Sequence, residues 1–154
     1  MTSKQINTKT IARIAAVQVI YQYQVTNTNV DIILARINDF YKDPDLKTDY
    51  EIGQSALKIK PSNKHLTELV NLISENLPII DDIIVSYLDK DWRLTDLPPL
   101  VHAILRTAIA ELKFFPEVSY KIIVNEYTDI ASDMLTSQEV GFINSLLDNY
   151  SKNK

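Results

Sequence analysis

Two histidines are the side chains of this sequence whose chemistry first suggests catalysis or metal binding. His65 and His102 stand far apart along the chain, and neither has the His-Glu-x-x-His spacing that places two metal ligands on one face of a helix. The chain contains no cysteine, which excludes disulfides, thiolate metal sites and cysteine nucleophiles. We therefore expect no metal site, and we interpret each histidine as a core or capping residue.

The second candidates are carboxylates that stand close together: Asp81 beside Asp82, and Asp89 near Asp91. Pairs of this kind can act in acid–base catalysis or bind cations. Here they fall near a predicted helix start and in a predicted turn, where the helix dipole and local turn hydrogen bonds favour acidic residues. The sequence therefore predicts no catalytic set, and we expect that the protein is not an enzyme.

Charge is unevenly distributed along the chain. The net charge is −4, yet the first 30 residues contain Lys4, Lys9 and Arg13 and no acid, and residues 52–67 form a second window without acids. An acidic protein cannot hold nucleic acid through its overall field, so such binding would need one of these local basic patches. The alternatives are ordinary solvated surface and, for the N-terminus, a transit peptide. Against a transit peptide, this segment leads directly into an apolar helix that the core needs.

The elements that must position these residues are helices. The chain has 154 residues, 45% of them hydrophobic, which suits one globular domain. Its two glycines disfavour hairpin-rich sheets, dinucleotide-binding folds and P-loops, all of which need glycine in turns. Apolar residues recur at helical spacing in seven stripes. The stripes run from Ile11 to Val25, Ile33 to Tyr41, Leu66 to Leu77, Ile80 to Leu88, Leu100 to Leu112, Ile123 to Met134 and Val140 to Leu147.

We therefore predict an all-α protein, a compact bundle of about seven helices in a single domain over residues 1–154, with residues 1–8 and 151–154 flexible. The first stripe is apolar on most sides and predicts the central helix. Residues 42–62 form a polar connection with a short helical turn at 50–59. The longest apolar window, 98–115, contains charged side chains and is not a membrane span. The predicted N-terminal caps are Thr8 or Thr10, Asn29, Ser62 or Asn63, Thr95 or Asp96, Ser119 and Ser137.

Several polar side chains fall inside these apolar helices. Because an unpaired buried charge costs several kcal/mol, Arg106, Glu111 and Glu126 predict a mutually satisfied network, in which we pair Arg106 with Glu126. Arg13, by contrast, lies on the polar edge of its helix with Gln18 and is a candidate for contact with a phosphate. The aromatic residues Tyr21, Tyr23 and Phe142 could stack on bases, although aromatic residues at helical spacing more often belong to the core.

Four blocks of the sequence, in order, carry a resemblance to a known family. They are the runs ARIAAVQVIYQ at 12–22 and ILRTAIAEL at 104–112, then VNE at 124–126 with DIA at 129–131, and FINSLLD at 142–148. Together they resemble the transcription antitermination factor NusB family over nearly the whole chain. No single block is a strong motif, but four blocks in register are specific.

The resemblance implies a helical fold without catalytic activity or cofactor, located in the cytoplasm. It implies that the protein pairs with the small-subunit ribosomal protein NusE, binds single-stranded boxA-type RNA in nascent ribosomal RNA transcripts, and meets other Nus factors and RNA polymerase indirectly. The implied RNA-binding residues are Lys4, Lys9, Arg13, Gln18, Lys121, Gln138 and Phe142, and the implied partner-binding residues are Tyr21, Leu97, Val101 and His102. Lys9, Thr10 and Ile11 stand where relatives often have several arginines, which predicts weaker RNA affinity.

Two other functions fit the same sequence. One is a free-standing copy of the NusB-like domain that is fused to a ribosomal RNA cytosine methyltransferase, although this chain lacks the glycine-rich loop and catalytic cysteine of such an enzyme. The other is a helical scaffold or DNA-binding regulator without RNA activity. A buried N-terminal segment, or effective competition by duplex DNA, would favour the latter.

Overall fold

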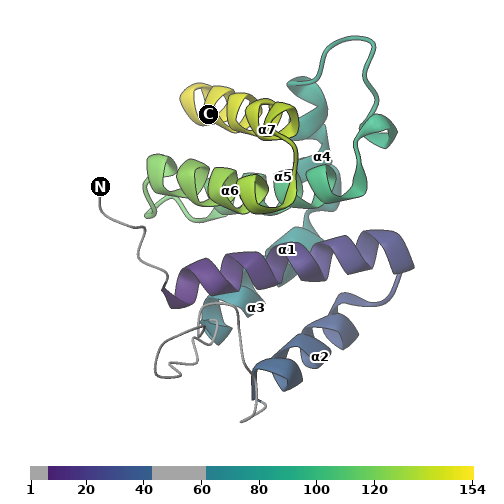
Figure 1. Cartoon of the computed structure of the whole chain (residues 1–154), viewed down its shortest axis with the longest axis vertical. Helices are drawn as coiled ribbons and strands as arrows, with labels where there is room; N and C mark the ends of the chain where they lie inside the picture. Colours follow the sequence, from purple (N-terminus) through teal and green to yellow (C-terminus); the bar gives the residue numbers. More distant parts are fainter. Residues whose placement is uncertain (1–6, 43–61) are drawn as a thin grey trace.

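The computed structural model describes residues 7–42 and 62–154, and this part of the chain is all-α (Figure 1). Within it lie seven α-helices and one short 3-10 helix, which agrees with the predicted bundle. The helices are α1 (Thr8–Thr26), α2 (Val30–Lys42), α3 (Asn63–Glu75), α4 (Leu77–Ser86), η2 (Leu94–Asp96), α5 (Pro99–Phe114), α6 (Tyr120–Met134) and α7 (Ser137–Asn153). No helix in these ranges is long and apolar enough to cross a membrane.

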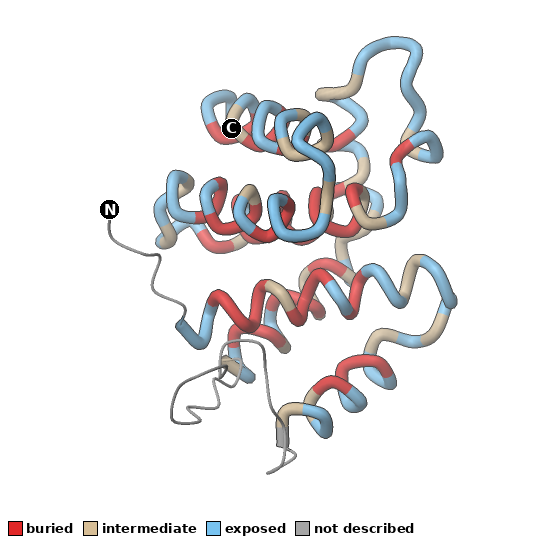
Figure 2. The backbone as a smooth tube through the Cα atoms, in the orientation of Figure 1, coloured by how far each residue is buried: buried red, intermediate tan, exposed pale blue. Residues whose placement is uncertain are grey.

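The core forms around α1 and α5. Helix α1 packs against α2, α3, α5 and α6, and α5 also packs against α3, α4, α6 and α7. Small residues let the two central helices approach closely, since Ala12, Ala16, Ala103 and Ala108 are fully buried. Figure 2 shows the buried positions gathered on the facing sides of these helices. The prediction that the first helix is central is therefore confirmed.

Local capping explains where several helices begin. Asn7 caps α1 by accepting a hydrogen bond from the backbone N–H of Thr10, so the predicted caps Thr8 and Thr10 are wrong. Ser62 caps α3 as expected. Thr136 begins α7 in a capping box with Glu139, in place of the predicted Ser137. These side chains satisfy backbone donors that have no partner within the helix.

Helix α5 begins without a side-chain cap. Its N-cap is Pro98, whereas Asp96, one of the two predicted caps, accepts a hydrogen bond from the backbone N–H of Arg93 in the η2 turn. At the other end of the chain, α7 continues to Asn153, and Ser151 is buried. The prediction of a flexible tail at 151–154 is therefore wrong. Residues 1–6, with Lys4, and the predicted turn at 50–59 lie outside the described residues.

Helices α1 and α6 pack together in one layer, and the functional candidates lie at the two ends of this layer. The beginnings of α1 and α6 lie together, because Lys9 and Ile122 line one groove. The end of α1 meets the beginning of α5, where Gln24 Nε2 donates to the carbonyl of Pro99 at 2.9 Å. Helix α7 runs back above α6 and begins near this second end (Figure 1). Since α6 has 15 residues, it spans about 22 Å, which sets the distance between the two ends.

Candidate nucleic-acid interface

Arg13 is buried in an ion cluster and not exposed on a polar edge. The residue is 2% exposed. Its Nε donates to Glu111 Oε1 at 2.9 Å and its Nη2 donates to Glu111 Oε2 at 2.6 Å. The remaining nitrogen, Nη1, donates to Glu126 Oε1 at 2.7 Å. All three guanidinium nitrogens are thus engaged by carboxylates, so the prediction that Arg13 contacts an RNA phosphate is wrong.

Three further side chains complete this cluster. Tyr127 Oη donates to Glu111 Oε1 at 2.7 Å, and Thr10 Oγ1 donates to Glu126 Oε1 at 2.7 Å. His65 Nε2 lies 3.5 Å from Glu111 Oε2 and, among the described residues, has no hydrogen-bond partner. The cluster therefore joins α1, α5 and α6 through hydrogen-bonded charges, as the stability of buried ions requires.

Burial and pairing shift the pKa values of the cluster in opposite directions. Burial raises the pKa of Glu111, but the nearby His65 ring, the Arg13 guanidinium and the Tyr127 hydroxyl stabilise its ionised form more, so its pKa falls to about 2. Burial lowers the pKa of Arg13, but its bonds to Glu111 and the adjacent carboxylates outweigh this and raise it. Burial and the charge of Glu111 raise the pKa of Tyr127. At neutral pH the cluster holds a charged arginine between two carboxylates.

The cluster supports a groove at the first end of the layer. The groove lies between the beginnings of α1 and α6 and has a volume of about 640 Å³, with Lys9, Ile122 and Asn125 among its lining residues. Lys9 and Lys121, two predicted RNA-binding residues, are both exposed here. This end therefore offers two exposed lysines beside the buried ion cluster, and the groove is also lined by the acid Asp129.

A second hollow lies at the other end of the layer. Its volume is about 260 Å³, and it brings together the predicted RNA-binding residues Gln138 and Phe142 with the predicted partner-binding residues Leu97 and Val101. Val101 is only 1% exposed and Leu97 is also buried, because both side chains belong to the core. They form the floor of this hollow and do not project from the surface.

Arg106 and His102 belong to a separate cluster near this hollow. Arg106 Nε and Nη2 donate to the two oxygens of Asp81 at 2.9 and 2.7 Å, and Arg106 Nη1 donates to Gln24 Oε1 at 3.1 Å. His102 Nε2 lies 3.0 Å from Asp81 Oδ1. Burial raises the pKa of Asp81, but Arg106 and His102 outweigh it, and the net shift is downward. The predicted pairing of Arg106 with Glu126 is wrong, because Asp81 holds Arg106 and Arg13 contacts Glu126.

The outer face of α1 carries two further candidates. Gln18 and Tyr21 are both exposed and nearly share one side of the helix. Tyr21 lies on the last turns of α1, close to Gln24, whose side chain reaches α5. The structure thus places Gln18, predicted for RNA, beside Tyr21, predicted for a partner.

Asp81 and Trp92 are residues that the sequence interpretation did not place in a site. Asp81 was attributed to the helix dipole, although it accepts hydrogen bonds from Arg106. Trp92, the only tryptophan of the chain, is 49% exposed and stacks on Phe142 with ring centroids 6.4 Å apart. The signal available in the sequence was a single tryptophan in a turn rich in aspartates. In the described ranges no group of three His, Cys, Asp or Glu residues is placed to hold a metal ion.

Comparison with known proteins identifies the family of the chain. The NusB family model matches residues 10–152. The transcription antitermination protein NusB of Rickettsia bellii (strain OSU 85-389) is 46% identical over 149 residues, which cover 96% of this chain and 92% of that protein.

Two solved structures share the fold. One is NusB of T. maritima, with a TM-score of 0.74 and 24% identity over 99% of this chain and 93% of that one. The other is a crystal structure of the antitermination factors NusB and NusE in complex with dsRNA, with a TM-score of 0.76 and 18% identity over 96% of this chain and 98% of that one. The family match and the sequence identity to the curated relative together show that this chain belongs to the NusB family.

Proposed function

We propose that this protein acts in transcription antitermination by binding single-stranded boxA-type RNA of nascent ribosomal RNA transcripts together with the ribosomal protein NusE. The observation that carries the proposal is the family match over residues 10–152. The solved complex of NusB and NusE with dsRNA supports RNA as the ligand and NusE as the partner. The choice of single-stranded boxA-type RNA rests on the family resemblance. A factor that acts on nascent bacterial transcripts works in the cytoplasm, beside other Nus factors and RNA polymerase.

The proposed RNA track joins the two ends of the layer. Lys9 and Lys121 supply phosphate contacts at the first end, and Gln138 and Phe142 supply amide and aromatic contacts at the second. Single-stranded RNA is bound by cations along its backbone and by aromatic and polar contacts with unstacked bases. Gln18 extends the polar contacts along α1. Arg13 takes no part in this track, because its guanidinium is hydrogen-bonded to Glu111 and Glu126.

The proposed NusE surface lies at the second end, around Tyr21 and His102. The chain has a net charge of −4, and an acidic surface attracts a basic ribosomal protein and favours its approach. Because Arg13 is buried in the ion cluster, fewer cations are available for contact with phosphates. Because phosphate contacts dominate RNA affinity at physiological salt, we propose that efficient binding requires the basic partner to lengthen the positive track.

A paired titration tests this function. Labelled boxA-type RNA is titrated with the protein at fixed salt, with and without NusE, and the affinity of the protein pair is measured with and without RNA. We expect NusE to tighten RNA binding and RNA to tighten the pair by the same factor, because linkage is reciprocal. Equal RNA affinities with and without NusE would reject the heterodimer. Equal competition by duplex DNA would favour a DNA-binding regulator.

A further inference from the structure

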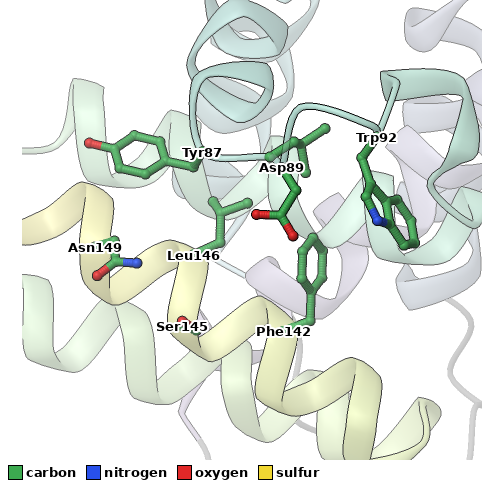
Figure 3. A pocket seen from close by; sticks show the side chains of 8 residues that line it. Tyr87, Asp89, Trp92, Phe142, Ser145, Leu146 and Asn149 are labelled. Atoms are coloured by element: carbon green, nitrogen blue, oxygen red, sulfur yellow. The ribbon is translucent and has the colours of Figure 1, made fainter.

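A pocket walled by aromatic rings lies beside α7, outside the proposed phosphate contacts (Figure 3). Its volume is about 340 Å³, and the residues that line it include Tyr87, Trp92 and Phe142, the carboxylate of Asp89, and the polar side chains of Ser145 and Asn149. This volume is at the lower end of the range for ligand pockets. The pocket therefore suits one side chain of a macromolecular partner.

The charge of the pocket selects a cation. Of the described residues that line the pocket, only Asp89 is charged. Figure 3 shows its carboxylate directed toward Phe142 and Leu146. Among the described residues no lysine, arginine or histidine forms an ion pair with Asp89. The neighbouring cations Lys90 and Arg93 do not line the pocket. A phosphate would meet a carboxylate here and no compensating base.

The aromatic walls select a flat cation. Trp92 presents an exposed indole, and Phe142 stacks against it at an interplanar angle of 25°, so the indole is held in position before any ligand arrives. The backbone N–H of Trp92 donates to the carbonyl of Asp89 at 3.0 Å, which fixes both residues on one turn. Aromatic faces attract cations, and tryptophan does so most strongly. A guanidinium can stack on a ring and also bond a carboxylate at two points, which an ammonium cannot.

A second feature indicates that the cation belongs to a polypeptide. Trp92 and Phe142 also line the hollow whose floor is Leu97 and Val101. An apolar hollow and an acidic aromatic pocket thus share one pair of rings. A protein segment that carries an arginine near an apolar residue would fill both, with its charge complementary to a protein of net charge −4.

We propose that this pocket binds an arginine side chain of a protein partner, with the guanidinium on the indole of Trp92 and against the carboxylate of Asp89. Ser145 and Asn149 accept the guanidinium protons that face α7, and the hollow above Leu97 and Val101 takes a neighbouring apolar side chain. The pocket uses neither Lys9 nor Lys121, but it shares Phe142 with the proposed RNA track. The arginine therefore competes with an RNA base for that ring and not for the phosphate contacts.

The single tryptophan provides a direct readout. In the full-length protein, the NMR signal of the Trp92 indole N–H is followed while a blocked pentapeptide, Gly-Leu-Gly-Arg-Gly, is added at constant ionic strength. The matched probe replaces arginine by citrulline, which keeps the shape of the side chain and removes its charge. We expect a saturable shift with the arginine peptide and at least fivefold weaker binding of the citrulline peptide. Equal binding of the two peptides would overturn the proposal.

Two variants distinguish binding in the pocket from attraction by the overall negative charge of the protein. Asp89→Asn should weaken the arginine peptide at least fivefold, whereas Asp91→Asn, an exposed acid of the same turn outside the pocket lining, should leave binding unchanged. Equal losses of peptide affinity in the two variants would show that the overall charge of the protein, and not the pocket, attracts the peptide. A single-stranded oligouridine that shifts the Trp92 signal, with no response to the arginine peptide, would assign the pocket to RNA and overturn the proposal. The RNA titration with NusE would stand in either case.

Discussion

Arg13 of α1 and Glu111 of α5 form a buried two-point ion pair, with Nε and Nη2 of the arginine 2.9 and 2.6 Å from the two carboxylate oxygens. The residues are 98 positions apart in the sequence. Glu126 of α6 takes the third guanidinium nitrogen. Three helices are therefore held in register by one side chain. Of the two described cations in the acid-free N-terminal segment, Arg13 is buried in the core and Lys9 is exposed at the surface.

Replacing Arg13 should destabilise the protein strongly. Arg13→Ala leaves two buried carboxylates without their cation, and we expect a loss of about 3 to 5 kcal/mol in the free energy of unfolding. Arg13→Lys should lose less, since it keeps the charge but not the two-point geometry. The matched control is Arg36→Ala at an exposed position of α2, with a change within about 0.5 kcal/mol. Denaturant unfolding measures all three. An Arg13→Ala protein of normal stability that failed to bind RNA would place Arg13 at the interface after all.

Acid should weaken the same cluster. The pKa of Glu111 is lowered from 4.5 to about 2 in the folded protein. A lowered folded-state pKa gives stability that is fully present above the unfolded value and is lost as the pH falls through the folded value. We expect the free energy of unfolding to fall between about pH 4.5 and pH 2, and Glu111→Gln to lose this part of the dependence. Unfolding curves across this range test it, with Asp82→Asn as the exposed control. Identical pH slopes in wild type and Glu111→Gln would contradict the assignment.

The second ion cluster should behave as an independent unit. Arg106 donates hydrogen bonds to Asp81, whereas Glu126 accepts hydrogen bonds from Arg13 and Thr10. A double-mutant cycle of Arg106→Ala with Asp81→Asn should give a coupling energy between about 0.5 and 3 kcal/mol. The same cycle with Glu126→Gln should be additive within about 0.5 kcal/mol. Strong coupling of Arg106 with Glu126 would restore the pairing expected from the sequence.

Lys9 and Lys121 should carry the salt dependence of RNA binding. Each phosphate contact on single-stranded nucleic acid contributes about 0.7 to the slope of log affinity against log salt. Replacing either lysine by alanine should lower the magnitude of the slope by roughly this amount and weaken binding at all RNA sequences alike. Arg36→Ala again serves as the control. The measurement is a set of RNA titrations at several salt concentrations in the presence of NusE. A slope unchanged by both substitutions would remove the two lysines from the RNA track.

The sequence alone determined the helices and the family. Helical spacing of apolar residues is a local property, so the stripe from Leu66 to Ile73 and the cap at Ser62 could be predicted without knowledge of packing. Leu77, which was predicted to end this stripe, begins α4 instead. Pro78 lies in the first turn of α4, a position that the sequence alone also favours for proline, because the missing N–H has no partner there within the helix. Four short blocks in register were enough to suggest the NusB family, because their order and spacing follow from the linear chain.

Tertiary structure alone decided which polar residues face inward and which charges pair. A helical projection places Arg13 on the polar edge of α1, but it cannot show that α5 and α6 cover that edge and bring Glu111 and Glu126 to it. Trp92 lies on an exposed turn, and only folding brings it against Phe142, 50 positions later. The physical reason is the same in both cases: local preferences act within a few residues, whereas burial and ion pairing depend on helices that are distant in sequence and adjacent in space.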